Sequence, residues 1–204
     1  MLGAVGVVPT PLIARVPDEQ RMLLSNVGWK DYVILRDVLD GPAIRMTYLE
    51  GALELMSPSP EHELWKTNIA RLVELYAHLR QIDLRGYGST TFKSEAVQRG
   101  AEPDECYLIG KKLADFPDIV LEVIRSAPLL DKLAIYAALG VPEVWTFRAG
   151  AFSIQTLDRA SSKYAAVPSS VLIPGLDFTV LARFATREDT AAALREFESI
   201  VQAR

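Results

Sequence analysis

Cysteine and histidine, which build many protein metal centres, are nearly absent from this sequence. Its 204 residues include one cysteine, Cys106, and two histidines. A single cysteine can form neither an internal disulfide nor a cysteine zinc cluster. We therefore expect a protein of a reducing compartment, the cytoplasm, in which Cys106 packs as a small, half-buried side chain.

Long hydrophobic runs, repeats and low-complexity tracts are also lacking. No stretch approaches the roughly 18 uninterrupted apolar residues of a membrane helix, and the apolar start MLGAVGVVPTP has neither a basic region nor a cleavage site. We expect no membrane partner. Because nothing marks an internal boundary, the sequence predicts one domain over residues 26–204, preceded by a peripheral segment over residues 1–25.

Basic stretches are absent as well. The chain carries 22 Lys and Arg against 26 Asp and Glu, which gives a net charge of -4. An acidic protein has no broad electrostatic attraction to nucleic acid or to anionic membranes. We therefore expect any bound nucleic acid to be held weakly, through few phosphate contacts. The scattered candidates for such contacts are Lys93, Arg99, Lys111, Lys112 and Arg125.

The sequence does contain a clear succession of helix and strand signals. Ser59 and Pro60 start a helix that runs to about Gln81, because serine caps a first turn and proline tolerates its first position. Three strand candidates follow, and then a helix closed by Gly140. The strand candidates, GYGSTTFKSEA, EPDECYLIG and DIVLEVI, are expected to form a meander.

Other elements are predicted on both sides of this block. Hairpins are expected to turn at Glu50-Gly51 and at Ala149-Gly150. We also expect a short helix from about residue 29 to Gly41, a strand pair at KYAAV and SVLIPG, and a C-terminal helix from about Arg187. This order predicts an α/β fold in which helices cover a sheet.

The segment FPDIVLEVIRSAP places one carboxylate inside a buried strand. Alternate residues of a strand share a face, and both faces are apolar except at Glu122. A buried and unpaired carboxylate costs several kcal/mol, so Glu122 requires compensation. An ion pair with Arg or Lys would provide it. A divalent metal is the alternative, and oxygen ligands suit Mg²⁺ or Mn²⁺.

A metal requires a second carboxylate near Glu122. Asp118 is nearest in sequence, but four strand residues separate the two Cα atoms by about 13 Å. Asp104 lies on the preceding strand candidate, and adjacent strands are only about 4.8 Å apart, so Asp104 is the better second ligand. Asp118 is left with two roles: a helper that orients a water or a basic side chain, or an ordinary polar residue at the strand entrance.

Lys132 is the candidate cation of the site. It falls on the core-facing side of the helix that follows Glu122, together with Ile135 and Tyr136. A lysine there either snorkels to water or reaches an inward partner. Glu122, ten residues upstream, favours the partner, and a hydrolytic metal site needs such a cation to steady developing negative charge.

These residues resemble the restriction-endonuclease-like superfamily, whose site is written PD-(D/E)XK. More narrowly, YLEGALELMSPSPEH, EPDECYLIG, PDIVLEVI and DKLAIYAALGVPEVW are similar to a large bacterial family of restriction-endonuclease-like proteins of uncharacterised role. The resemblance covers about Trp29 to Leu157. It implies a mixed sheet core with the order αβββαβ, a metal on Asp104 and Glu122, and Lys132 as the catalytic lysine.

One departure and two auxiliary residues accompany the resemblance. The lysine expected two residues after the glutamate is Ile124 here, and the resemblance permits its relocation to Lys132. Glu50 and His62 match the N-terminal motif of the family and would approach the same site. An ordinary polar or capping role for His62 stays open.

Two functions follow from this sequence. The first is a Mg²⁺- or Mn²⁺-dependent endonuclease that hydrolyses phosphodiester bonds in nucleic acid, with Lys132 stabilising the added charge. The alternative is a catalytically silent, nuclease-like binding or assembly module. The choice between DNA and RNA is open, and so is a homodimer.

Overall fold

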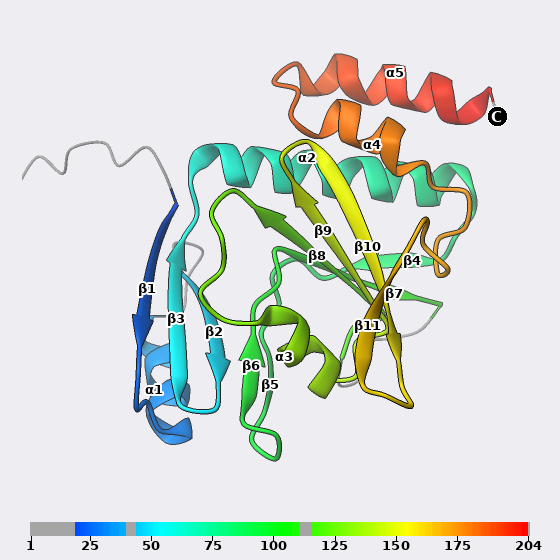
Figure 1. Cartoon of the computed structure of the whole chain (residues 1–204). Helices are drawn as coiled ribbons and strands as arrows, with labels where there is room; N and C mark the ends of the chain where they lie inside the picture. Colours follow the sequence, from blue (N-terminus) through cyan, green and yellow to red (C-terminus); the bar gives the residue numbers. More distant parts are fainter. Residues whose placement is uncertain (1–18, 40–43, 111–115, 204) are drawn as a thin grey trace, which may run out of the picture.

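The computed structural model describes residues 19–39, 44–110 and 116–203; Gly41, Lys111 and Lys112 lie outside these ranges. Within them the chain forms two β-sheets and five α-helices (Figure 1). None of these helices is both long and apolar enough to cross a lipid bilayer.

The larger sheet has the strand order β11-β10-β9-β8-β7-β4. Strands β8 and β9 run parallel, and the other neighbours are antiparallel. Helix α2 (Pro60–Leu79) precedes β4 and helix α3 (Lys132–Ala138) links β8 to β9, so the predicted αβββαβ order and fold class are confirmed. The strands are β4 (Leu84–Gly86), β7 (Glu105–Ile109), β8 (Ile119–Ile124), β9 (Glu143–Arg148), β10 (Ala151–Asp158) and β11 (Lys163–Val167).

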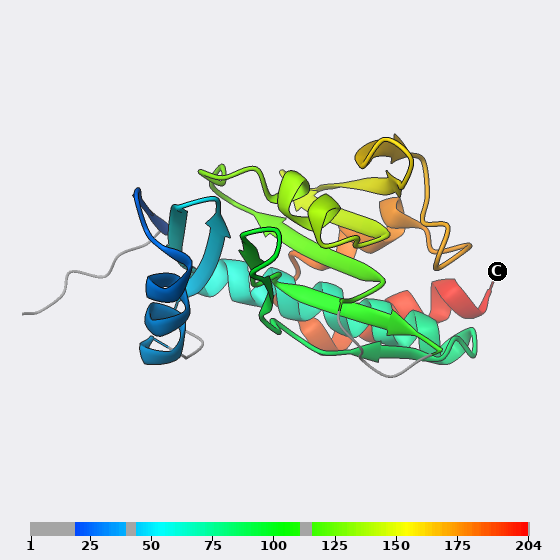
Figure 2. The same ribbon diagram turned by 90° about the horizontal axis from the view of Figure 1, so that it is seen from below.

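One face of this sheet is covered by three helices. Ser59 caps α2 by accepting a hydrogen bond from the His62 N–H at 3.2 Å, and Pro60 is the first residue, as predicted. The buried side of α2 packs on Leu121 and Trp145 of the sheet. Helices α4 (Phe178–Ala185) and α5 (Thr190–Gln202) pack beside α2 on this side (Figure 2).

The opposite face carries α3. Asp131 caps this helix by accepting a hydrogen bond from the Ala134 N–H at 3.1 Å. Ile135 and Tyr136 pack with Val120 and Val144 of the sheet. Strand β8 is therefore covered on both faces, which explains its nearly continuous apolar sequence.

The smaller sheet has the order β1-β3-β2-β6-β5 and lies with helix α1 (Trp29–Val38) at one end of the molecule (Figure 1). The predicted hairpin at Glu50-Gly51 is confirmed, with both residues at positive φ. Tyr32 of α1 stacks on Tyr48 with ring centroids 4.7 Å apart. The strands are β1 (Gln20–Leu24), β2 (Arg45–Leu49), β3 (Ala52–Ser57), β5 (Phe92–Ser94) and β6 (Arg99–Ala101).

The predicted three-strand meander is wrong in its first member. Strand β5, from GYGSTTFKSEA, pairs with β6 in the smaller sheet, whereas the neighbour of β7 is the three-residue strand β4. Alternation of apolar residues does not determine which strands pair, and three residues are too short to show alternation.

In the C-terminal part, one prediction is wrong and another is incomplete. SVLIPG is not a strand, because the N–H groups of Val171 and Leu172 donate to the Glu143 carboxylate at 2.7 and 3.1 Å instead of to a neighbouring strand. The C-terminal helix is confirmed as α5, but α4 before it was not predicted.

The N-terminal segment contributes a strand. Residues 20–24, within the segment predicted to be peripheral, pair with β3 as β1. The predicted domain boundary after residue 25 stays a prediction. Residues 20–24, which precede that boundary, nevertheless belong to the smaller sheet.

Gly100 of β6 provides a test of how α1 packs on the smaller sheet. A Cβ there would lie 2.8 Å from Tyr32 Cζ and still closer to the Tyr32 hydroxyl, a buried group without a hydrogen-bond partner among the described residues. We expect Gly100→Ala to lower the free energy of unfolding by about 1–3 kcal/mol, as for other overpacked cores.

The matched control is Tyr32→Phe, which removes the hydroxyl that the new Cβ meets. By itself it should be nearly neutral because that hydroxyl is unpaired. In a urea-denaturation cycle, the double variant should recover at least about 0.5 kcal/mol of the Gly100→Ala loss. Strict additivity would contradict the proposed contact.

Candidate active site

Asp104 and Glu122 lie side by side on neighbouring strands. The β7–β8 register, in which Glu105 faces Leu121, continues to place Asp104 opposite Glu122. Both residues are buried, with exposed fractions of 1% and 4%. The Val123 N–H donates a hydrogen bond to Asp104 Oδ2 at 2.7 Å, which fixes that carboxylate against β8. The structure thus brings together the two acids that the sequence pairs.

Helix α3 supplies two donors to Glu122. Lys132 Nζ donates to Glu122 Oε2 at 2.7 Å, and the Tyr136 hydroxyl donates to Oε1. Lys132 is the first residue of α3, and Tyr136 lies one turn later on the same side. Lys132 therefore faces inward, to Glu122. Tyr136 was not singled out from the sequence, although its spacing from Lys132 gives a signal.

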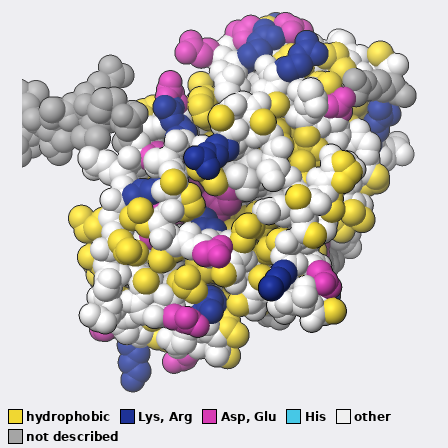
Figure 3. Space-filling model, viewed as in Figure 1, with side chains coloured by type: hydrophobic (Ala, Val, Ile, Leu, Met, Phe, Trp, Pro, Cys, Tyr) yellow, Lys and Arg dark blue, Asp and Glu magenta, His cyan; other side chains and the backbone are white. Residues whose placement is uncertain are grey.

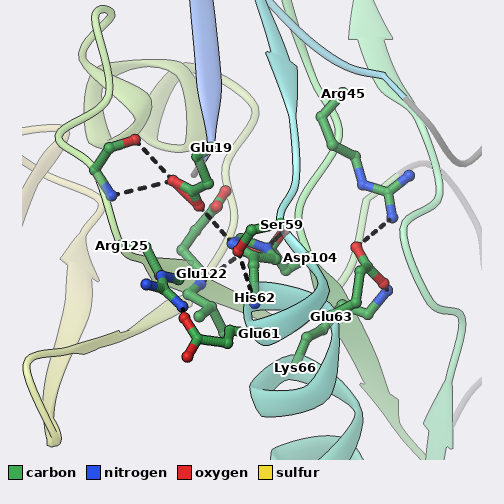
Figure 4. Close-up of polar contacts among 12 residues, drawn as sticks. Glu19, Arg45, Ser59, Glu61, His62, Glu63, Lys66, Asp104, Glu122 and Arg125 are labelled. Atoms are coloured by element: carbon green, nitrogen blue, oxygen red, sulfur yellow. Dashed lines mark hydrogen bonds and ion pairs between the residues drawn. The ribbon is translucent and has the colours of Figure 1, made fainter. Parts of the chain in front are cut away.

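His62 joins Asp104 to the N-terminal segment. Its Nε2 lies 2.9 Å from Asp104 Oδ1, and its Nδ1 lies 2.7 Å from Glu19 Oε2 (Figure 4). The imidazole is fully buried and is held by these two carboxylates, while the Ser59 cap bonds to the backbone N–H of His62 at the start of α2. The structure therefore brings His62 to the carboxylate pair.

Glu19 is a residue that sequence reasoning missed. Its Oε1 accepts hydrogen bonds from the Ser126 N–H at 3.1 Å and the Ser126 hydroxyl at 2.8 Å, and it pairs with Arg21 at 3.2 Å. No motif or periodicity marks Glu19 in the sequence, because its partners lie 43 and 107 residues away. Its role is visible only once the chain is folded.

Burial and neighbouring charges set the protonation of the two acids. Burial raises the pKa of Glu122, and the negative charge of Asp104 raises it further against the opposing effect of Lys132. Burial also acts to raise the pKa of Asp104, but the hydrogen bond and charge of His62 outweigh it, so that pKa is lowered. Asp104 is therefore the acid that stays ionised more readily.

The two cations keep their protons. Burial acts to lower the pKa of His62, but its hydrogen bonds to Asp104 and Glu19 raise it to about 9. Burial likewise opposes the charge of Lys132, and Glu122 and Asp104 raise its pKa nevertheless. The site thus places two neighbouring acids, Asp104 and Glu122, between two protonated bases, His62 and Lys132.

Glu50 does not approach this site. It occupies the turn of the β2–β3 hairpin, where it is exposed and pairs with Arg99 at 2.9 Å. The carboxylate of this hairpin that reaches the site region is Glu54, whose Oε2 accepts from the Leu129 and Leu130 N–H groups at 2.9 and 3.0 Å. The expectation for Glu50 is corrected, because positive φ at the turn directs that residue to the hairpin tip.

Asp118 and Arg125 have other contacts. Asp118 Oδ2 accepts from the Ile109 N–H at 3.0 Å at the opposite end of β8, which agrees with a polar residue at a strand entrance. The Arg125 guanidinium pairs with Glu61 and lies 5.0 Å from the Trp65 ring centroid. Arg125 thus packs against the start of α2.

The donor set of Asp104 and Glu122 fits a hard divalent cation. Each carboxylate oxygen already accepts one hydrogen bond and retains a second lone pair. Mg²⁺ is commonly bound through one or two carboxylates plus waters or substrate oxygens. No group of three or more His, Cys, Asp and Glu side chains in the described ranges could hold a metal, so such an ion would need those additional oxygens.

Comparisons with known proteins found one matching protein family and similar solved structures. A protein-family model described as "Uma2: Putative restriction endonuclease" matches residues 29–180, which include Asp104, Glu122 and Lys132 but not Glu19. Among solved structures, the chain is similar to a putative nuclease belonging to DUF820 from Anabaena variabilis ATCC 29413. That similarity has 12% identity and a TM-score of 0.46, and covers 67% of this chain and 90% of the other. No curated protein matches the chain.

The raised pKa of His62 predicts a pH-dependent stability. Its folded-state pKa of about 9 exceeds the ordinary value of 6.5, so its contribution is complete below pH 6.5 and is lost as pH rises through about 9. At about 1.4 kcal/mol per pKa unit, we expect the free energy of unfolding to fall by up to about 3 kcal/mol over this range. Urea denaturation at several pH values measures it.

Glu19→Gln should reduce this fall, because it removes one of the two charges that raise the pKa of His62. Glu50→Gln is the matched control: it neutralises an exposed glutamate away from His62 and should keep the wild-type pH dependence. A direct NMR titration of His62 is practical because the chain has only two histidines. A titration midpoint of His62 near pH 6.5 would contradict the buried ion pairs of His62 with Glu19 and Asp104.

Proposed function

Because the chain belongs to the Uma2 family of putative restriction endonucleases, we propose that it is a metal-dependent nuclease acting at Asp104, Glu122 and Lys132. One observation carries the proposal: a partly buried lysine, with its side chain 11% exposed, bonds to Glu122 at 2.7 Å, beside a second, buried carboxylate that directly precedes the adjacent strand. Such a group of perturbed, buried charges is expected where chemistry is done.

Asp104 and Glu122 would hold Mg²⁺ or Mn²⁺ through their remaining lone pairs. When bound, such an ion would polarise a phosphoryl oxygen and lower the pKa of a water. His62 and the Val123 N–H orient Asp104, and the Tyr136 hydroxyl orients Glu122. Lys132 retains its proton and so presents a positive charge that can stabilise the charge added to the phosphate.

A catalytically silent binding or assembly module is the second candidate. Its support is that the cluster is internally satisfied: His62 and the Val123 N–H bond to Asp104, and Lys132 and Tyr136 bond to Glu122. Lys and Arg side chains on the face in Figure 3 lie scattered among acidic and apolar ones, without a continuous basic path. These observations favour weak binding of nucleic acid.

Lys132→Met tests the catalytic assignment. It removes the cation that stabilises added charge, so we expect the rate of oligonucleotide cleavage in Mg²⁺ or Mn²⁺ to fall at least about a hundredfold. Lys30→Met, at an exposed lysine of α1, is the matched control and should cleave at the wild-type rate. Equal cleavage by Lys132→Met and wild type would contradict the assignment.

Lys132→Met also leaves the Glu122 carboxylate buried without its cation. This loss can lower the free energy of unfolding by about 3–5 kcal/mol. Lys132→Arg therefore accompanies it, because arginine keeps the charge that the fold needs. The guanidinium is larger and planar, so we expect at least about a tenfold loss of rate with a folded protein, verified by circular dichroism. Wild-type activity in Lys132→Arg would show that the ammonium geometry is unimportant.

Metal binding is tested separately from turnover. Mg²⁺ or Mn²⁺ at 100 times its Kd should raise the free energy of unfolding by about 2.7 kcal/mol. Asp104→Asn should abolish this stabilisation, because it replaces a carboxylate ligand by an amide while it keeps the shape of the side chain. An unchanged unfolding curve of the wild type across millimolar Mn²⁺ would contradict the metal site.

A further inference from the structure

A pocket opens beside the carboxylate pair. It has a volume of about 500 Å³ and lies between α3 and strands β8, β9 and β10. Glu122, Lys132 and Tyr136 line its inner end, whereas Asp104 is not among its lining residues. A molecule in this pocket can therefore contact Lys132 and Glu122 directly, but not Asp104.

The floor of the pocket is a polar strip across three strands. In the sheet register Glu122 faces Thr146 on β9, and Thr146 faces Ser153 on β10. Directly opposed residues share a face of the sheet, so a carboxylate and two hydroxyls lie in line. The side walls are mainly apolar, with Ile124 and Leu133 among them, but they also include the polar Asp131 and Gln155.

Arg148 lies at the outer end of the same pocket. It faces Ile124 on β8 and Ala151 on β10, and it is exposed. Within the described part of the chain, Arg148 has neither an ion-pair nor a hydrogen-bond partner. Its guanidinium is thus available to an anion, and guanidinium groups bind phosphate by paired hydrogen bonds.

We infer that this pocket takes one unpaired nucleotide next to the scissile phosphate, so that the substrate is a single strand of nucleic acid. The inference rests on the proposed nuclease function. The volume of about 500 Å³ lies within the range of pockets for small organic ligands, which suits a single nucleotide and not a duplex segment. A base stacked and paired in a duplex cannot enter such a pocket unless it is extruded.

The chemistry of the pocket matches the parts of a nucleotide. Apolar walls suit the faces of a base, and the hydroxyls of Thr146 and Ser153 can bond to its edge or to the sugar. Lys132 and Arg148 line the same pocket, so each can contact a phosphate that flanks the bound nucleotide. Two such contacts are few, which agrees with an acidic protein whose basic residues are scattered.

Ser153→Trp tests the pocket, because an indole at this exposed position would fill it. We expect at least a tenfold loss in kcat/KM for a single-stranded oligonucleotide, and the same loss of its affinity by fluorescence anisotropy in Ca²⁺. Val38→Trp adds the same side chain at a 73% exposed position of α1 and is the matched control. Ala151→Trp, at the pocket mouth, repeats the test if Ser153→Trp does not fold.

The outcomes separate the pocket from the nuclease proposal. NMR shifts of the Leu133, Ile124 and Ala151 methyl groups on adding the oligonucleotide, lost in Ser153→Trp, support the pocket even if wild type cleaves nothing. Cleavage that is unaffected by both tryptophan variants, or that is faster on duplex than on single strand, overturns the pocket and leaves the nuclease standing. Absence of both binding and cleavage overturns both.

Discussion

The structure is organised around the burial of two carboxylates on adjacent strands. Asp104 and Glu122 repel each other and lose hydration, and each would cost several kcal/mol if left unpaired. The fold compensates with His62 from the start of α2 and Lys132 from the start of α3. The central strand pair and the first turns of both flanking helices are thus tied to one electrostatic requirement.

The smaller sheet is joined to this cluster through the segment between β8 and α3. Arg21 donates to Ser126 and to Glu54, and Glu54 accepts from the backbone of Leu129 and Leu130. Glu19 binds Ser126 and His62 together. Because these contacts cross from β1 and β3 to the β8–α3 segment, the smaller sheet helps to hold Lys132 at Glu122.

Sequence reasoning succeeded where local chemistry is strong. The cap at Ser59, the turn at Glu50-Gly51, and the apolar strand around Glu122 each depend on neighbours within a few residues. These features, together with the family resemblance, were enough to predict the αβββαβ order and the convergence of Asp104, Glu122 and Lys132. The catalytic and metal-binding roles of these residues stay predictions.

Sequence reasoning failed where the role of a residue depends on partners that are distant in the sequence. Glu19 gains its role from His62 and Ser126, and β4 is a strand only because β7 lies beside it. SVLIPG has the composition of a strand, but the Glu143 carboxylate takes its backbone donors. Glu50 and Glu54 share one hairpin, and only the folded structure shows that Glu54 is the one that reaches the β8–α3 segment.

The position of the lysine connects the site to the pocket beside it. In the PD-(D/E)XK pattern a lysine would stand at residue 124, on the same face of β8 as Glu122. Here Ile124 lines the pocket wall, and the ammonium of Lys132 reaches Glu122 from α3 at the inner end. Moving the cation from strand to helix therefore leaves an apolar wall where a charge would otherwise stand. The apolar wall beside a paired Glu122 thus depends on two positions, an isoleucine at 124 and a lysine at 132.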